Sequence, residues 1–527
     1  MKKRFPILAV LGIAGYALLL GLLVLAERGQ PGGSILSIGD AVWYSLVTMT
    51  TVGYGDVYPV TVPGRVIGIL FLVLSAGTLM AMVGAAYAFL RDRGMLWLML
   101  ERIRREKCDI FSEYNEFSIA LARNLGKTDP RACYLFCDCS EKQQFTNPVM
   151  VKQAFCFPQR TEEILRKLDG PGLKTVFCVG KMPTGNYALS RELMDLSAEM
   201  KRARVRICCG ALETGDLPGV TFFDISACAA RTYWEKYPLK EKAVLLVGGG
   251  RLAQALLDQA ILVNCREPFH TTVYHLFGNW ENYRREHPGL ALCFAVNEAA
   301  DATRDALVFH AEPWNGNRTL LESAGRIIFC SDDRAENADR AIGLLRGFPL
   351  AGKVYAAAQA MPFPGVAFGA MAAIATGEMT MHGSLDARAR MLQSFYAAGT
   401  DSAETWEELT PFLRASNRAA ADHLATKIQL LLPSEDTGGK VTKELLEKAV
   451  RAWGQVADRE PYRRNEHARW CRFYALYNWR PGPEKNSAAR THPCLVPYEE
   501  LSREDQEKDD NAWLQIGLLA EEEEAQS

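Results

Sequence analysis

The chain has 527 residues, a formal net charge of −2 and a hydrophobic share of 48%. A chain of this length is expected to form about three to five domains. The near-neutral charge gives no indication of nucleic-acid binding, which usually requires an excess of basic residues. The apolar residues are unevenly spread, and residues 5–26 and 66–90 contain no charged side chain. Each run exceeds the ~20 residues that cross a bilayer, so we expect membrane spans at about 5–26 and 63–93.

Basic residues flank both predicted spans. Three lie before the first span and six follow the second: Lys2, Lys3, Arg4, Arg91, Arg93, Arg102, Arg104, Arg105 and Lys107. The positive-inside rule therefore predicts a multi-pass protein of the cell membrane with both termini in the cytoplasm. The first apolar run could also belong to a signal peptide, but its length and the second span favour a retained anchor.

The stretch between the spans is too short to cross the membrane again. A helix over about 39–50 would be ~18 Å long, so it can enter the bilayer and stop midway. It is followed directly by Thr51-Val52-Gly53-Tyr54-Gly55 and then Asp56. The two glycines permit backbone angles that turn successive carbonyls to one side. Four such strands around an axis can replace the hydration shell of a potassium ion.

This order of span, half-length helix, TVGYG and span resembles two-transmembrane potassium channels of the prokaryotic type. The resemblance implies a homotetramer, a selectivity filter at 51–55, and K⁺ as the permeant ion, bound at Thr51, Val52, Gly53 and Tyr54. Only two spans are predicted and no arginine-periodic helix is present, so a voltage sensor of the usual kind is not expected. Gly77 or Gly84 is a candidate gating hinge in the second span; the alternative is that these small residues let helices pack closely. The pore domain is assigned to residues 1–107.

Residues 108–380 alternate between apolar strands and amphipathic helices, which predicts α/β domains. Strands are expected at 109–111, 133–137, 175–179, 205–209, 243–247, 272–277, 291–296, 306–309 and 326–330. After the strand at 243–247, the run Gly248-Gly249-Gly250-Arg251-Leu252-Ala253 has the GxGxxA spacing of a phosphate-binding turn. Gly248, Gly250 and Arg251 are thus nucleotide-binding candidates, and a purely structural turn is the alternative. No acidic residue follows the next strand, at Gly278-Asn279, to hold a ribose.

Behind a two-span pore, this segment resembles the RCK (TrkA-N) domains that regulate potassium conductance. The resemblance implies two Rossmann-like copies, at 108–240 and 241–380, and a ring of eight in a tetramer. The first copy has no glycine motif after its first strand, which favours a structural role for it. The stretch 351–379 is rich in alanine and glycine and is expected to be a buried connector.

Residues 381–520 contain an internal repeat, because Trp406-Glu407-Glu408-Leu409 recurs as Tyr498-Glu499-Glu500-Leu501. The second copy resembles the RyR domain, named for the ryanodine receptors. The resemblance rests on Glu466-His467-Ala468-Arg469-Trp470, Trp479, Gly482-Pro483 and the run 491–501, THPCLVPYEEL. It implies a mainly α-helical, tandem RyR-like module.

Several residues of that module could form an aromatic slot for a small-molecule ligand: His467, Trp470, Trp479, Arg490, His492, Pro493 and Tyr498. Arg469, Arg480 and Arg490 would supply positive charge, which suits a nucleobase with a phosphate. The alternative is that the aromatic rings form the core of a small helical module. The acidic tail, 521–527, is expected to be disordered around Glu521–Glu524.

The fold class we predict is therefore multi-domain: an α-helical two-span pore, two α/β Rossmann-like domains and an α-helical tandem module. The predicted function is a potassium-selective channel gated by a cytoplasmic ligand, such as a nucleotide, a cyclic nucleotide or a divalent cation. The alternative is a membrane-anchored, nucleotide-binding redox sensor or enzyme that uses the GxGxxA fold. We expect no enzymatic activity, because no catalytic triad, Walker A loop or ribose-binding acid supports it.

Overall fold

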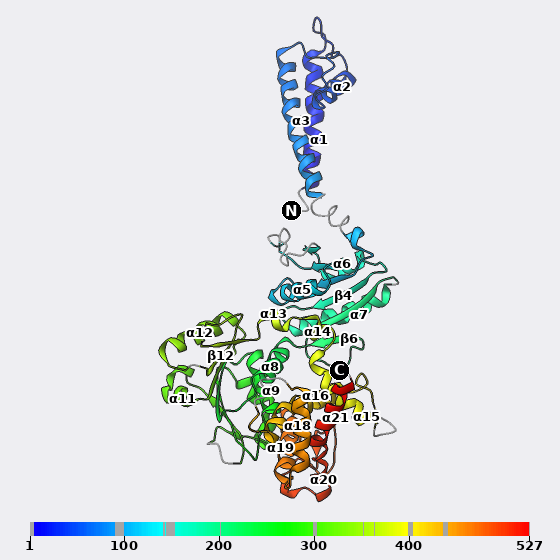
Figure 1. Ribbon diagram of the computed structural model, residues 1–527. Coiled ribbons are helices and arrows are strands. Elements are labelled where there is room, and N and C mark those ends of the chain that lie inside the picture. Colours follow the sequence, from blue (N-terminus) through cyan, green and yellow to red (C-terminus); the bar gives the residue numbers. More distant parts are fainter. Residues whose placement is uncertain are drawn as a thin grey trace. The chain divides into compact units, whose positions relative to one another are not determined.

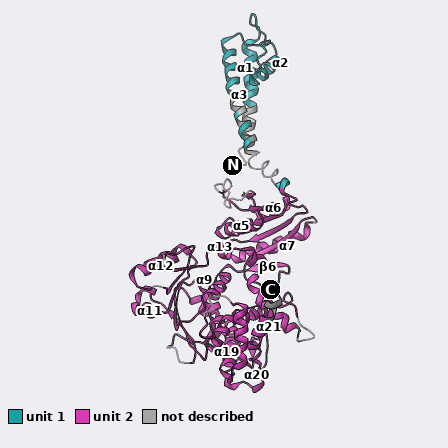
Figure 2. Cartoon of the chain, in the orientation of Figure 1, with its two compact units in different colours: residues 1–102 teal, residues 103–527 magenta. Residues whose placement is uncertain are grey.

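The computed structural model describes most of the chain (Figure 1). The described residues are 5–89, 100–140, 143, 153–200, 202–298, 303–350, 352–362, 364–398, 404–435 and 441–525; side chains at 5–13, at most positions of 74–89 and at 521–525 are not described. The chain divides into two compact units, residues 1–102 and 103–527 (Figure 2).

Among the described residues of the first unit are the helices α1 (Phe5–Glu27), α2 (Ile38–Met49) and α3 (Val62–Phe89). Helix α2 begins at a capping box, in which the Ser37 hydroxyl accepts from the Asp40 amide and the Asp40 carboxylate accepts from the Ser37 amide. This cap explains why the short helix starts at Ile38, one residue before the predicted boundary.

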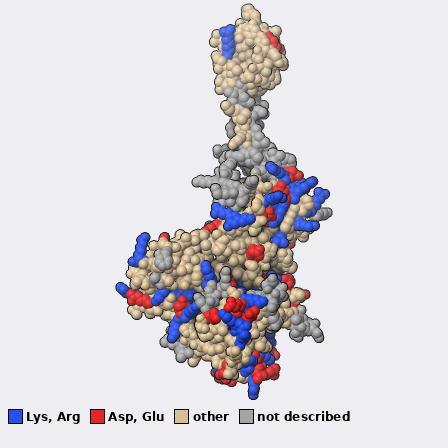
Figure 3. Space-filling view, in the orientation of Figure 1, with Lys and Arg blue, Asp and Glu red and all other residues tan. Residues whose placement is uncertain are grey.

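The three helices of this unit pack on a small apolar core, formed by Leu20, Leu23, Ile35, Ala41, Ile67 and Phe71. Many other apolar side chains of the unit are exposed, among them Leu25, Ile69 and Val73. The face in view in Figure 3 shows few charged residues on this unit, whereas both signs of charge cover the second unit. When only the described residues are searched, no helix is long and apolar enough to cross a membrane. The two spans stay predictions.

The second unit begins with a six-stranded parallel sheet in the order β3-β2-β1-β4-β5-β6. Its strands are β1 (Cys108–Phe111), β2 (Cys133–Phe136), β3 (Ala154–Cys156), β4 (Leu173–Cys178), β5 (Arg204–Gly210) and β6 (Val220–Phe223), and its helices are α5 (Glu116–Thr128), α6 (Thr161–Lys167) and α7 (Pro183–Glu199). Strands β1 and β2 are buried along their whole length, as continuous apolar strands of a parallel sheet are. The doubly wound order places the chain reversal between β1 and β4.

A seven-stranded parallel sheet follows, in the order β13-β12-β11-β7-β8-β10-β9. Its strands are β7 (Ala243–Val247), β8 (Val273–Phe277), β9 (Ala295–Val296), β10 (Ala306–His310), β11 (Arg326–Phe329), β12 (Val354–Ala357) and β13 (Val366–Phe368), with helices α9 (Arg251–Val263), α10 (Glu281–Glu286), α11 (Arg318–Ser323) and α12 (Arg334–Gly347). The chain reversal of this sheet lies between β7 and β11. The predicted α/β character of residues 108–380 is confirmed, and the strands of both sheets are parallel.

Helix α8 (Ile225–Lys236) lies between the two sheets in the sequence and packs against α9. It buries Tyr233 and Trp234, and the Trp234 indole donates to the Leu256 carbonyl at 2.9 Å. One apolar core contains residues of both sheets, from Phe111 of β1 to Phe368 of β13. The two α/β domains are therefore packed together rather than linked by a free hinge.

Two sequence-based predictions in this region are wrong. The expected strand at 291–296 is much shorter, because residues 291 and 292 end the 3₁₀ turn Pro288–Leu292 and only Ala295 and Val296 join the sheet. The expected connector at 351–379 contains strands β12 and β13 and the short helices α13 (Met371–Ile374) and α14 (Gly377–Met381). Its alanines suit a strand pair that neighbouring elements cover, because small side chains allow close packing.

The remainder is helical and lies beside α8 and α9 (Figure 1). Its helices are α15 (Ala387–Ala398), α16 (Pro411–Asp422), α17 (Leu424–Leu431), α18 (Lys443–Gln455), α19 (Glu460–Leu476), α20 (Arg503–Lys508) and α21 (Asn511–Ala525), and strands β14 (Arg480–Pro481) and β15 (Thr491–His492) form a small pair. Three tryptophans, Trp406, Trp453 and Trp513, are buried in its main core.

The acidic tail also differs from the sequence prediction. Helix α21 extends to Ala525 and so includes Glu521–Glu524, where disorder is expected. The helix is held by Trp513, Ile516 and Leu519, which are buried. Glutamates are good helix formers, so a docked helix can continue through them.

Candidate functional site

The backbone after α2 leaves the helical conformation at the predicted filter. Thr51, Gly53 and Gly55 have φ values of 58°, 61° and 75°. Positive φ at every second residue is accessible to glycine at little cost and is unfavourable for threonine. No heavy atom lies within 4 Å of a Cβ built on Gly53 or Gly55, so space is not what requires glycine there. The glycines are required by backbone conformation.

The filter loop is tied to the helix that precedes it. The Val52 and Gly53 amides both donate to the Val47 carbonyl, at 3.0 and 3.3 Å. The rings of Trp43 and Tyr54 stack with an interplanar angle of 1° and centroids 6.0 Å apart. The Trp43 indole also donates to the Asp56 carboxylate at 2.8 Å. The sequence does not predict the Trp43–Asp56 pair, because a tryptophan and an aspartate 13 residues apart form no recognisable motif.

A second tie joins the segment after the filter to the end of α1. The Glu27 carboxylate is fully buried and accepts from the amides of Val60 and Thr61, both at 2.9 Å. A Cβ on Gly64, in the first turn of α3, would lie 2.0 Å from the Glu27 carboxylate. Glu27 thus fixes the entry into α3, and Gly64 is needed for that approach.

Both hinge candidates lie in helix α3 (Val62–Phe89). Gly84 lies in α3 with no heavy atom within 4 Å of a built Cβ. Gly77 lies in the same helix, but its surroundings are outside the described residues. The hinge stays a prediction.

The GxGxxA loop has the expected strand–turn–helix setting, between β7 and α9 (Arg251–Val263). Its amide groups, however, are engaged within the chain. The Arg251 and Leu252 amides donate to the Asp332 carboxylate at 3.1 and 3.0 Å. The Arg251 guanidinium pairs with Asp224 at 2.8 Å. The geometry therefore supports the structural alternative for Gly248, Gly250 and Arg251.

The predicted aromatic slot is filled by the chain itself. Trp479 is 4% exposed and stacks on Phe412 of α16, with centroids 5.4 Å apart. Trp470 contacts Tyr474 and His492 at centroid distances of 4.3 and 4.9 Å. These rings belong to a core rather than to an open slot, because the first copy of the repeat supplies Phe412 as a packing partner.

The basic residues assigned to the slot are also dispersed. Arg469 is buried and pairs with Glu466 at 2.7 Å. Arg490 is exposed, has a φ of 51° and donates to the Tyr477 carbonyl at 2.8 Å. Arg480 is exposed on the small β14–β15 pair, and Pro493 follows β15. The structure therefore does not bring these groups together.

Two of the candidates do line a cavity. His467 and Tyr498 face a space of about 750 Å³ between α19 and the second α/β domain. Its other lining residues are Glu267, Pro268, Leu292, Cys293, Thr303, Arg304, Arg464, Ala468, Cys471, Pro481, Leu495, Val496, Pro497, Glu499 and Glu500. A mostly apolar cavity of this size with a few polar groups is the usual form of a small-molecule site. Burial lowers the pKa of His467 and so favours its neutral form, and its Nε2 lies 2.8 Å from the Val496 carbonyl, which accepts a hydrogen bond.

A buried ion cluster lies behind this cavity. Arg472 of α19 is fully buried and pairs with Glu267 at 2.7 Å and Asp305 at 3.0 Å. Burial raises the pKa of both carboxyl groups, and the Arg472 charge opposes that rise. Removal of one member would leave an uncompensated charge, so the cluster holds α19 firmly on the second α/β domain. Glu267 belongs to both the cluster and the cavity wall.

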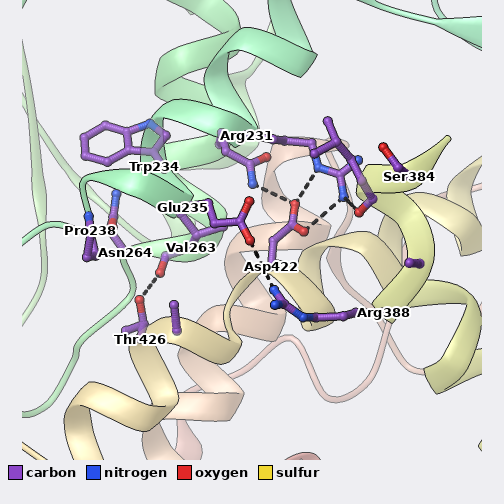
Figure 4. A pocket seen from close by; sticks show the side chains of 14 residues that line it. Arg231, Trp234, Glu235, Pro238, Val263, Asn264, Ser384, Arg388, Asp422 and Thr426 are labelled. Atoms are coloured by element: carbon purple, nitrogen blue, oxygen red, sulfur yellow. Dashed lines mark hydrogen bonds and ion pairs between the residues drawn. The ribbon is translucent and has the colours of Figure 1, made fainter. Parts of the chain in front are cut away.

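A second charged junction joins α8, α9 and the helical part (Figure 4). Arg231 pairs with Asp386 at 2.6 Å and with Asp422 at 2.8 Å, and Gln259 donates to Asp422 at 2.8 Å. Arg388 pairs with Glu235 at 3.3 Å across a cavity of about 220 Å³. The positive charges that line this small cavity already have carboxylate partners, which makes it a structural joint rather than an anion site.

Comparison with known proteins identifies two segments. Residues 7–92 match the family model of ion channels, and residues 453–516 match that of the RyR domain. A voltage-gated potassium channel of Aeropyrum pernix is 45% identical over 60 residues, which cover 11% of this chain and 20% of that protein. Potassium voltage-gated channel subfamily A member 5 of Mus musculus and member 4 of Homo sapiens are each 46% identical over 54 residues, 10% of this chain and 9% and 8% of theirs. The chain thus spans a fifth or less of the curated relatives it matches.

Solved structures of the GsuK channel cover more of the chain. The channel itself is 14% identical, covers 72% of this chain and 100% of that chain, and has a TM-score of 0.34. GsuK bound to ADP is also 14% identical, covers 67% and 90% of the two chains, and has a TM-score of 0.32. Likeness at this level supports no conclusion about ligands. The segments identified by family models and close relatives resemble channels and an RyR domain rather than enzymes.

Proposed function

We propose that this chain is one subunit of a homotetrameric, potassium-selective channel of the cell membrane, with both termini in the cytoplasm. The observation that supports it best is the loop 51–55, where the filter motif alternates positive φ and is tied to α2 by Trp43. The segment lies within the match to ion channels. Such a loop offers carbonyl oxygens for dehydrated K⁺ when four copies surround an axis.

The exposed apolar side chains of the first unit support its contact with lipid and with other subunits. Val66, Ile69 and Val73 of α3 are more than half exposed in the single chain. Contiguous apolar surface of this kind marks contact with lipid or with other subunits. In the proposed tetramer these side chains are covered by neighbouring subunits and by the bilayer.

Gating is assigned to a cytoplasmic small molecule, bound by the tandem RCK-like domains and the RyR-like module. The cavity lined by His467 and Tyr498 is the proposed site. Glu267 connects its wall to the ion cluster of Arg472, so an occupant can favour one arrangement of α19 relative to the second α/β domain. A ligand shifts the open–closed equilibrium only by its difference in affinity for the two states.

The test of conduction is potassium flux from liposomes that contain the purified full-length chain. We expect flux that is carried by K⁺ and at least about 100-fold slower for Na⁺, as filter coordination implies. Equal flux of both ions, or none under any ligand, would contradict the channel. A panel of nucleotides and cyclic nucleotides, added on the cytoplasmic side, then tests gating, with His467→Gln and Tyr498→Phe as cavity variants and Arg490→Gln as the exposed control.

The alternative function, a membrane-anchored redox sensor or enzyme, depends on the GxGxxA loop. That loop is engaged by Asp332. No observation on the chain favours the alternative over conduction.

A further inference from the structure

The GxGxxA loop lies where an open α/β sheet normally binds a phosphate. Strand β7 ends at Val247, α9 begins at Arg251, and the neighbouring strand β11 lies across the chain reversal of the sheet. Ligands of such sheets bind outside the carboxyl ends of the strands at this reversal, with phosphate on the helix amides.

That position is occupied by Asp332, from the loop after β11. One carboxylate oxygen accepts from the Arg251 amide at 3.1 Å and the other accepts from the Leu252 amide at 3.0 Å. A Cβ built on Gly250 would lie 2.1 Å from the nearer oxygen. Glycine at 250 therefore admits an internal carboxylate in the way that other loops admit a phosphate.

The loop that carries Asp332 is held from its other side. The buried Asn337 accepts from the Ser331 amide at 2.8 Å and donates to the carbonyls of Ser331 and Ala357 at 2.8 and 3.1 Å. Asp333 accepts from the Ala335 and Glu336 amides and so caps α12. Asp332 is consequently placed by a connected set of hydrogen bonds rather than by a free loop.

The remaining sides of the glycine loop are closed by backbone. A Cβ on Gly249 would lie 2.5 Å from the Asn279 amide nitrogen, and one on Gly278 would lie 2.1 Å from the Gly248 carbonyl oxygen. The loop after β8, where a ribose would be held, thus packs directly on the glycines. The Arg251 side chain points to Asp224 instead of to the loop.

We propose that Asp332 takes the place of a phosphate at the second α/β domain and excludes nucleotides from it. Its negative charge repels a phosphate and its oxygens already satisfy the two amides that a phosphate would need. Asp332 is then a residue that determines ligand specificity: the gating ligand of the proposed channel binds elsewhere. The inference builds on the proposed function, but the contact of Asp332 with the glycine loop does not depend on whether the chain conducts ions.

The test is hydrogen exchange of the full-length chain in the segment 248–263, with ADP as the probe because its pyrophosphate is the group that such loops hold. In the native chain we expect no effect of ADP on this segment. In Asp332→Ala the Arg251 and Leu252 amides should exchange about fivefold faster, the factor of a lost helix cap, and ADP should slow them again. Asp333→Ala is the matched control, since it uncaps α12 and should leave 248–263 unchanged.

ADP protection of 248–263 in the native chain, or unchanged exchange in Asp332→Ala, would overturn the proposal. If Asp332→Ala does not fold, Asp332→Ser removes the charge and shortens the side chain. We then expect ADP to protect 248–263 in Asp332→Ser, and exchange that ADP leaves unchanged would also overturn the proposal. Potassium flux of the native chain, measured in parallel, tests the proposed function separately. A chain that conducts without K⁺ selectivity would contradict the channel but would not change the hydrogen-exchange result at 248–263.

Discussion

Two glycine loops of this chain, one after helix α2 and one between strand β7 and helix α9, use glycine for different reasons. At 51–55 the glycines have positive φ and open space around them. At 248–250 no glycine has positive φ, and each is crowded by atoms of another loop. In the proposed channel the first loop offers its carbonyls to an ion, while the second loop is closed by Asp332. The same residue type thus indicates an open site in one case and tight internal packing in the other.

The largest effect is expected at the open loop. Gly53→Ala places a side chain at a φ of 61°, which costs about 1 kcal/mol or more and turns the neighbouring carbonyls. We expect K⁺ flux to fall at least about 100-fold, since coordination depends on those carbonyls. Gly185→Ala, a helical glycine of α7 with open space, is the control and should retain flux. Normal selectivity in Gly53→Ala would show that the loop is not a filter.

The next largest effect is expected when K⁺ is removed, which should change the loop 51–55 and leave the loop 248–250 unchanged. If K⁺ binds at 51–55, replacing it with Na⁺ removes about 2.7 kcal/mol of stabilisation when K⁺ had been at about 100 times its dissociation constant. The expected result is a lower melting temperature of the tetramer, with unchanged hydrogen exchange in 248–263. An equal melting temperature of the tetramer in K⁺ and in Na⁺ would contradict ion binding at 51–55.

A packing test at the closed loop should have an effect of about 1–3 kcal/mol. Gly250→Ala forces a Cβ against the Asp332 carboxylate, and overpacking of this kind is destabilising. Hydrogen exchange of 248–263 should accelerate. Adding Asp332→Gly removes the clash, so the double variant should be less perturbed than the sum of the two single variants. Simple additivity would mean that the two residues do not touch.

The smallest effect is expected at the hydrogen bond between Trp43 and Asp56, beside the loop 51–55. Trp43→Phe keeps the ring beside Tyr54 but deletes the hydrogen bond to Asp56. A bond to a charged group contributes about 1.5–3 kcal/mol when buried and less at this exposed position. We expect K⁺ selectivity to be lost at a temperature several degrees lower, and Asp56→Asn to have a similar effect that does not add to it. Additive effects of the two variants would show that the bond is absent in the channel.

Patterns of residues that are close together in the sequence determined several elements of this protein. The apolar runs, the half-length helix with its Ser37 cap and the TVGYG motif follow from residues close together in the sequence. The alternation of apolar strands and amphipathic helices likewise predicted the α/β character of residues 108–380. The wrong predictions, at 291–296 and 351–379, concern short edge elements in which composition alone does not distinguish a strand from a turn.

Tertiary structure decided what each motif does. Asp332 lies more than 80 residues from Gly248, Phe412 lies far from Trp479, and Glu267 lies far from Arg472, so no local pattern could place them together. The physical reason is that packing and ion pairing depend on distance in space, whereas capping, periodicity and backbone freedom depend on neighbours in the chain. The sequence alone therefore determined that a filter motif follows a short helix, and only the fold showed that the second glycine loop holds a carboxylate of its own chain.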